Sequence, residues 1–346
     1  MELGIYTFAD LPVDSSTGKY GSAHQRLQDL IEEIVLADEV GLDVFALGEH
    51  HRPEYAVSSP AVVLAGAAVK TKQIKLSSSV TVLSSDDPVR VFQDFSTLDL
   101  LSNGRAEIMV GRGSFIESFP LFGYNLKDYD ELFSEKLALL LKLNSSEVLS
   151  WTGKFRPSFQ GLGVYPRPLQ TELPIWIAVG GTQSSVVRAA QLGVPMAIAI
   201  IGGSPAQFAP LTKLYRDISK ASGHDPSKVQ LSINSHAFIA DSAPDAANIF
   251  YPGYSRSMNK LGRERGWAPF NRNQFDQSIS KHSALLVGSP QQVIDKILYE
   301  HELFGHTRFL AQMDVGGVPH KDLMRSIELL GTAVAPVVRK ELNKNL

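Results

Sequence analysis

Two adjacent histidines, His50 and His51, are the side chains whose type and position most suggest chemistry in this sequence. They follow an apolar run at residues 43–47 that is typical of a buried strand, and Glu49 stands directly before them. Histidine exchanges protons near neutral pH, so an imidazole at a strand end could act as a general acid or base. A buried structural histidine is the alternative at both positions. His236, inside a later apolar run, carries the same two interpretations.

An arginine among glycines forms a second candidate site. Arg112 stands between two glycines directly after an apolar run, and the pair Gly180 and Gly181 follows another such run. Glycine lets a backbone approach a ligand closely, and a guanidinium makes strong, charge-assisted hydrogen bonds to phosphate. These residues suit a planar, phosphorylated ligand. The alternatives are a surface ion pair for the arginine and a plain turn for the glycine pair.

The composition limits the kinds of partner that the chain can have. With 346 residues, 44% hydrophobic and 20% charged, the chain can bury a large core, and it has no cysteine for disulfides, thiolate zinc sites or a thiol nucleophile. The formal net charge of −3 provides no basic field for nucleic acid or anionic lipid. No apolar run reaches about 18 residues and the amino terminus lacks the pattern of a signal peptide, so we expect a cytoplasmic protein without a membrane partner.

The elements that must position these residues alternate along the chain. Strands are expected at residues 3–8, 43–47, 74–83, 106–110, 175–179, 196–201, 229–240 and 308–313, each followed by a helix. This alternation predicts an α/β fold, a (β/α)8 TIM barrel that forms a single domain over residues 1–346, with a doubly wound open sheet as the runner-up. The C-terminal strand ends of such a barrel form its active face, where His50, Arg112 and the glycine pair would meet.

Some element boundaries and one interruption are also predicted. Three residues that precede amphipathic segments are expected to be helix N-caps, namely Ser22, Ser59 and Asp87. Ser59 and Asp87 also stand directly before a proline, which is common at the first position of a helix. Residues 145–174 break the alternation with glycine, proline and aromatic residues. We therefore expect an excursion of short strands in that segment.

Four stretches that span nearly the whole chain resemble one enzyme family, in the order in which the family has them. They read GLDVFALGEHH, SSVTVLSSDDPVRVFQDFSTLDLLSNGRAEIMVGRGSF, PIWIAVGGTQSSVVRAAQLGVPMAIAIIGG and LLVGSPQQVIDKI. The family is that of the bacterial luciferase-like flavin-dependent monooxygenases. The resemblance implies a (β/α)8 barrel, with insertion segments at its C-terminal face, that takes reduced FMN from a separate NAD(P)H-dependent flavin reductase. It also implies that the enzyme uses O2 to oxygenate a small organic substrate.

The resemblance further implies roles for single residues. His50 matches the family's catalytic histidine, and Arg112 matches the arginine that holds the FMN phosphate. Gly180, Gly181 and Ser184 fall where the family closes the phosphate site. This chain departs here from luciferase itself, which looks to have a carboxylate and a hydroxyl where these glycines stand, so backbone amides would replace those side chains.

Two structural features follow from the same resemblance. The strand at residues 74–83 would contain a non-proline cis peptide between Ser79 and Val80, with Ser79 beside the flavin. The resemblance also supports a homodimer without fixing its interface. The apolar residues of the helices at residues 60–71 and 88–101 spread wider than one stripe, so we expect these helices to join the two copies.

The sequence leaves other functions open. A deazaflavin-dependent dehydrogenase shares the barrel and the phosphate end, and some barrel relatives bind flavin without turnover. Adjacent histidines are poorly placed for one metal ion, although spacing does not exclude a metal hydrolase with ligands from several strand ends. No full GxGxxG, GxxxxGK[ST] or GxSxG pattern indicates a dinucleotide site, a P-loop or a serine nucleophile.

These residues do not indicate which substrate the protein would use. Its pocket is expected from the loops after Phe8 and Gly113 and from residues 251–275, where YPGY and RGWAPF would supply aromatic surface.

Overall fold

The computed structural model describes residues 1–14 and 16–344, and its centre is a closed barrel of parallel strands. The barrel strands are β1 (Glu2–Thr7), β2 (Val44–Leu47), β3 (Lys75–Ser78), β5 (Ala106–Gly111), β8 (Ile175–Val179), β9 (Met196–Ile200), β10 (Leu231–Ile239) and β12 (Arg308–Gln312). Pairing of β9 with β10, β10 with β12 and β12 with β1 closes the sheet. The (β/α)8 barrel prediction is therefore confirmed, and the alternative of an open sheet is wrong.

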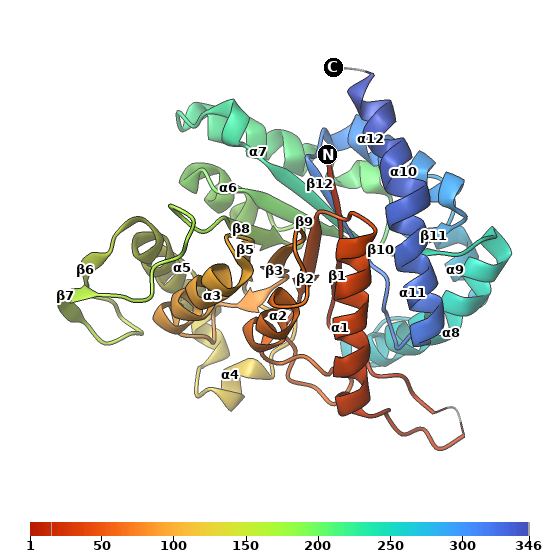
Figure 1. Ribbon diagram of the computed structural model, residues 1–346, viewed down its shortest axis with the longest axis horizontal. Coiled ribbons are helices and arrows are strands. Elements are labelled where there is room, and N and C mark those ends of the chain that lie inside the picture. The colour runs from red at the N-terminus through yellow and green to blue at the C-terminus, as the bar shows by residue number, and fades with distance from the viewer. Residues whose placement is uncertain (15, 345–346) are drawn as a thin grey trace.

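Helices cover the outside of this barrel (Figure 1). The long ones are α1 (Ala23–Glu39), α2 (Pro60–Ala68), α3 (Pro88–Ser102), α5 (Tyr129–Ser145), α6 (Gln183–Leu192), α7 (Ala209–Ala221), α8 (Ala243–Arg265), α10 (Pro290–Phe304), α11 (His320–Leu329) and α12 (Ala335–Asn343). Shorter helical segments are α4 (Ser118–Leu121), η1 (Leu126–Asp128), η2 (Pro205–Phe208), η3 (Pro226–Lys228), α9 (Arg272–Ser278) and η4 (Leu330–Val334).

The predicted N-caps differ in how they work. The Asp87 carboxylate accepts hydrogen bonds from the backbone N–H groups of Val89 and Arg90, and the Ser22 hydroxyl accepts one from Gln25. Ser59 occupies the N-cap position of α2 but makes no side-chain capping bond. Proline at the first position of α2 still fixes where that helix begins.

The stretch expected as one strand at residues 74–83 is divided in two. β3 ends at Ser78, β4 (Thr81–Val82) follows, and the peptide between Ser79 and Val80 is cis. The predicted non-proline cis bond is therefore confirmed. The division places Ser79 and Val80 between two segments that both pair with β5.

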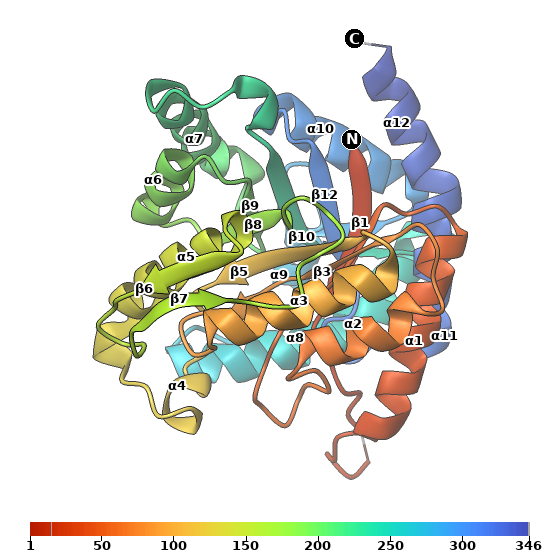
Figure 2. The same cartoon turned by 60° about the vertical axis from the view of Figure 1, so that its left-hand side comes forward.

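The expected excursion at residues 145–174 is an antiparallel hairpin of β6 (Val148–Trp151) and β7 (Phe159–Gly163). The connection between its strands reaches the start of α3, where Arg156 Nε lies 2.9 Å from Asp87 Oδ2. Figure 2 shows the hairpin beside α3 and α5. This insertion therefore packs along the outer helices, whereas α4 and α8 follow the C-terminal ends of β5 and β10 as expected for insertions at that face.

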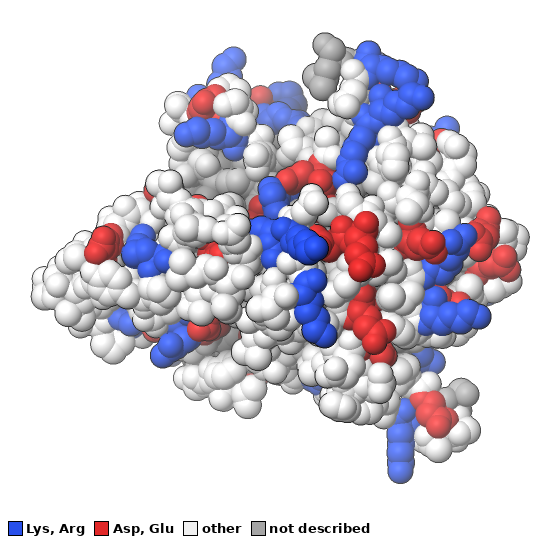
Figure 3. Space-filling model, viewed as in Figure 1, with Lys and Arg blue, Asp and Glu red and all other residues white. Residues whose placement is uncertain are grey.

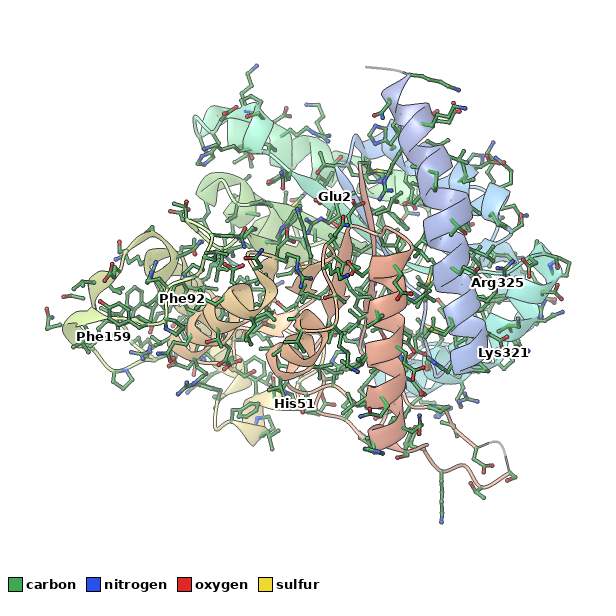
Figure 4. The ribbon with its side chains drawn as sticks, in the orientation of Figure 1. Glu2, His51, Phe92, Phe159, Lys321 and Arg325 are labelled. Carbon is green, nitrogen blue, oxygen red and sulfur yellow. The ribbon has the colours of Figure 1, made fainter. Side chains whose placement is uncertain are left out.

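The two ends of the barrel carry different side chains. At the N-terminal end Arg308 donates to both Glu107 oxygens, at 2.7 and 3.0 Å, and to Glu2 at 2.7 Å. Figure 4 shows Glu2 at this upper end and His51 at the opposite, lower end. The functional groups singled out by the sequence therefore gather at the lower, C-terminal end.

The surface has no strong bias toward one charge on the face seen in Figure 3, where basic and acidic side chains are interspersed. This agrees with the formal net charge of −3. Within residues 1–14 and 16–344, no helix is long and apolar enough to cross a membrane.

Candidate active site

A cavity of about 500 Å³ opens at the C-terminal ends of the strands. The residues that line it come from most of the strand ends and from α8, and they include Phe8, His50, Ser79, Arg112, Gly180, Thr182, His236 and Gln312. The structure thus brings together His50, Ser79, Arg112 and Gly180, which lie far apart in the sequence. Gly181 and Ser184 are not part of this lining, although the adjoining Thr182 is.

His50 is held among aromatic rings. It stacks on Phe8 at 4.1 Å between ring centroids with 25° between the ring planes, and the rings of Tyr55 and Phe115 lie at 4.5 and 4.7 Å. Burial, with the nearby positive charge of Arg52 as a smaller cause, lowers the pKa of His50 to about 3. His50 is therefore a neutral imidazole at neutral pH, and the expectation that it titrates near neutrality is wrong.

Glu49 orients His51 rather than His50. Its Oε1 lies 2.7 Å from His51 Nε2, and its Oε2 accepts a hydrogen bond from the backbone N–H of Val82 at 2.9 Å. The edge of the His51 ring also meets Phe122, with 5.2 Å between ring centroids. The Glu49 carboxylate thus holds His51, whereas the described contacts of the His50 ring are with the aromatic side chains of Phe8, Tyr55 and Phe115.

Arg112 reaches out from the end of β5 toward α5. Its Nη1 lies 2.5 Å from Asp130 Oδ1, and its guanidinium lies over the Tyr129 ring, 5.0 Å from the centroid. The Tyr129 hydroxyl donates to the carbonyl oxygen of Gly113 at 2.7 Å, which anchors this ring to the strand end. The alternative of an ion pair is therefore confirmed. Arg112 also lines the cavity, and its binding of a phosphate stays a prediction.

The segment after β8 supplies an open stretch of backbone. A Cβ added at Gly180 would meet no atom within 4 Å, so a ligand can approach the chain there. Gly181 has a φ of +102°, which favours glycine because side chains are strained in that region. Ser184 is exposed on the first turn of α6. Gly180 thus forms part of the accessible cavity wall, whereas Gly181 makes a turn outside the cavity lining.

Comparison with known proteins agrees with this geometry. The family model described as luciferase-like monooxygenase matches residues 1–307. The chain belongs to the luciferase-like monooxygenase family. It is 24% identical to the oxygenase component of the flavin-dependent trigonelline monooxygenase of Acinetobacter baylyi, with 91% of this chain and 90% of that protein covered. It is 22% identical to the alkanal monooxygenase alpha chain of Aliivibrio fischeri, with 87% and 90% covered.

Solved structures of the luciferase-like fold are similar over nearly the whole chain. The monooxygenase RslO1 of Streptomyces bottropensis has a TM-score of 0.82 at 23% identity, covering 97% of this chain and 99% of that one. The oxygenating constituent of 3,6-diketocamphane monooxygenase from Pseudomonas putida, solved with FMN, has a TM-score of 0.76 at 20% identity, covering 97% and 98%. An F420-dependent secondary alcohol dehydrogenase has a TM-score of 0.75 at 16% identity, covering 98% and 99%. The chain is therefore an oxidoreductase in a family with both flavin- and deazaflavin-dependent neighbours.

In this luciferase-like barrel His236 lies on the cavity wall and is also packed by the core. His236 on β10 lies opposite Gln312 on β12 in the strand register. Its ring is edge-to-face with the Tyr254 ring, with 5.6 Å between the ring centroids. Burial lowers the pKa of His236 to about 4, and hydrogen bonding of the ring to the Gln312 side chain opposes that shift. Its Nδ1 is buried without a partner among the described residues. His236 is thus a second neutral imidazole beside the cavity.

A group of charged residues forms the outer wall and was not predicted. Arg52 lies 3.3 Å from Glu117, 2.5 Å from Glu264 and 3.8 Å from Glu54, and Lys260 pairs with Glu54. These pairs join the loop after β2, the start of α4 and the last turns of α8. The sequence offers one signal, an arginine directly after the two histidines, but its partner Glu264 is 212 residues away.

Residues 251–275 contribute to the cavity wall as expected, but the expectation that this part of the wall is aromatic is wrong. α8 lines the cavity through charged, polar and aliphatic residues, namely Arg256, Ser257, Met258, Lys260, Leu261, Glu264 and Arg265. The aromatic residues Tyr251, Tyr254, Phe270 and Phe275 pack on one another, and Trp267 is 52% exposed. The aromatic rings of the cavity wall come instead from β1 and the segment after it, from the loop after β2 and from the segment after β5, namely Tyr6, Phe8, Tyr20, Tyr55, Phe115 and Tyr129.

Proposed function

We propose that this luciferase-like protein is the oxygenase component of a two-component flavin monooxygenase. It binds reduced FMN delivered by a separate NAD(P)H-dependent flavin reductase and uses O2 to oxygenate a small organic substrate. The observation that carries the proposal is the cavity that has Arg112 and the open backbone of Gly180 on its wall, together with His50 among aromatic rings. The named oxygenase relatives support the same reading.

The described residues fit a phosphorylated flavin. Arg112 would hold the phosphate, and the exposed start of α6, with Gly180, Gly181 and Ser184, would complete that end of the site. Ser79, which lines the cavity and is 5% exposed, would face the ring system. Reduced FMN supplies the electrons that activate O2 for transfer to the substrate.

His50 would act on a proton during oxygen transfer. As a neutral imidazole it can donate one ring N–H to an oxygen atom and accept a proton at the other nitrogen. Phe8, Tyr55 and Phe115 fix its orientation and keep water away from it. These contacts hold the ring at a rigid strand end, where a general acid or base must be positioned accurately.

A deazaflavin-dependent dehydrogenase is the second candidate, because the barrel is also similar to an F420-dependent alcohol dehydrogenase. Mixing the protein with reduced FMN, O2 and candidate substrates tests the first proposal through an oxygenated product. Reduced F420 with carbonyl substrates tests the second. A tight flavin complex that yields no product with either cofactor would instead indicate a flavin-binding protein without turnover.

We also propose that residues 1–346 act as one cytoplasmic domain that forms a homodimer through α2 and α3. Exposed aliphatic side chains on and beside these helices support that surface, since Val62 and Val69 are 70% and 71% exposed and Leu100 and Leu101 are 46% and 50% exposed. Light scattering is expected to give twice the chain mass of 37.8 kDa.

A further inference from the structure

The proposed flavin site contains one group of the wrong charge for a phosphate. Asp130 lies on the first turn of α5, its side chain is 68% exposed, and its Oδ1 accepts a hydrogen bond from Arg112 at 2.5 Å. The Arg112 side chain is only 22% exposed and lines the cavity. The guanidinium assigned to the cofactor phosphate is therefore already engaged by a carboxylate of the same chain.

We propose that Asp130 is a built-in competitor of the flavin phosphate. Its carboxylate occupies the anion position on Arg112 and turns away when the flavin binds, which weakens the complex and keeps the flavin exchangeable. The inference rests on the proposed function, because it requires Arg112 to bind the phosphate. An oxygenase that receives reduced flavin from another protein and releases oxidised flavin each cycle needs such exchange.

A second guanidinium adds to the positive charge at this position. Arg188, on α6, has its Nη1 buried without a partner among the described residues. Burial lowers the pKa of Arg188, the charge of Arg112 lowers it further, and the charge of Asp130 raises it. The Arg188 guanidinium also lies over the ring of Phe133, which follows Asp130 by three residues on α5, at 5.4 Å from the ring centroid. The three charged groups therefore lie in one neighbourhood. Two guanidinium groups with one carboxylate leave a net charge of +1, which becomes +2 when Asp130 turns away. A phosphate of charge about −1.5 to −2 would nearly neutralise the latter.

The exchange of one anion for the other is energetically inexpensive. An exposed ion pair contributes about 0.2–1 kcal/mol, so turning the Asp130 side chain into solvent costs little. A phosphate monoester carries a charge of about −1.5 to −2 near pH 7 and would repel a carboxylate that stayed beside Arg112. Removing the Asp130 charge should therefore strengthen FMN binding by roughly two- to fivefold.

The test compares Asp130→Asn with Glu131→Gln. Glu131 is the next residue on the same helical turn, and its carboxylate pairs with Lys154 at 2.5 Å instead of with Arg112. Both variants lose one negative charge at the start of α5, so any effect on the helix dipole is matched. Binding of FMN and riboflavin is measured by quenching of flavin fluorescence at low ionic strength. Asp130→Asn is expected to bind FMN about two- to fivefold more tightly with riboflavin unchanged, and Glu131→Gln to change neither.

The outcomes separate this inference from the proposed function. Weaker or unchanged FMN binding in Asp130→Asn would overturn the inference, and so would an equal gain in Glu131→Gln. Arg112→Ala serves as the reference, with an expected loss of about ten- to a hundredfold for FMN and little for riboflavin. If Arg112→Ala weakens both flavins equally, the phosphate site itself is wrong. If it is selective for FMN while Asp130→Asn has no effect, only the competitor role fails.

Discussion

At the scale of single residues, His50 carries the proposed chemistry and gives the first prediction. Replacing it with alanine removes the imidazole but leaves Arg112 and Gly180 in place. We expect His50→Ala to bind FMN within a few-fold of the parent protein and to form hydrogen peroxide instead of product, with turnover reduced about 10²- to 10⁴-fold. Product and peroxide are measured together against oxygen consumed. His224→Ala, at a histidine outside the cavity lining, should stay fully coupled.

The pKa of His50 gives a second prediction about the same residue. Because burial lowers this pKa to about 3, the imidazole stays neutral from pH 5 to pH 8 in the folded protein. Above the unfolded-state pKa of about 6.5 the ring is neutral in both states, and its full contribution to stability is present. As the pH falls from there toward 3, only the unfolded protein binds the proton, so the free energy of unfolding decreases. The NMR chemical shifts of the His50 ring should be constant between pH 5 and pH 8. A titration midpoint near 6.5 would show that the ring is accessible to water.

The sequence predicts site residues well where a strand end carries them. His50, Ser79, Arg112 and Gly180 all reach the same cavity because parallel strands bring their C-terminal ends together. The electrostatics of the site were not predictable in that way. The pKa of His50 depends on rings from three separate loops, and Arg52 pairs with a residue 212 positions away.

At the scale of elements, the start of α3 offers a stability prediction. The Asp87 carboxylate caps Val89 and Arg90 through one oxygen and binds Arg156 of the hairpin connection through the other. Asp87→Ala should lower the free energy of unfolding by about 0.5–2 kcal/mol. Ser59→Ala is the matched control, because Ser59 stands before Pro60 at an N-cap without a side-chain bond and its loss should be near zero. Urea unfolding measures both, and equal losses would contradict the capping account.

The fold was predictable element by element for a physical reason. Strands of a parallel barrel are buried on both faces, so β2, β8 and β9 are continuous apolar runs that stand out in the sequence. The missed elements include β11 (Leu286–Gly288) and α9, which at three and seven residues are too short to show a hydrophobic period. The aromatic residues of 251–275 were assigned to the cavity because composition alone does not say which face of α8 turns inward.

At the scale of the whole molecule, the N-terminal end of the barrel is closed by charge instead of by aliphatic packing. Arg308 from β12 is 1% exposed, lies over the Trp176 ring at 4.2 Å and binds Glu107 from β5 and Glu2 from β1. The network thus links strands from the beginning, middle and end of the chain across the barrel interior. The C-terminal end, by contrast, keeps an open cavity, so we expect the stability of the barrel to depend strongly on the N-terminal end.

Breaking that network should therefore destabilise the whole barrel. Glu107→Ala leaves the buried Arg308 guanidinium with Glu2 as its remaining carboxylate, and removing one partner of a buried ion pair costs about 3–5 kcal/mol. Urea unfolding should show a loss of that size. The control is Glu328→Ala, which removes an exposed partner of Arg325 (Figure 4) and should cost at most about 1 kcal/mol. A double variant that also replaces Arg308 with methionine removes the uncompensated charge and should recover part of the loss. If the double variant is less stable than Glu107→Ala, packing of the arginine stem on the Trp176 ring, and not its charge pairing, supports the closed end of the barrel.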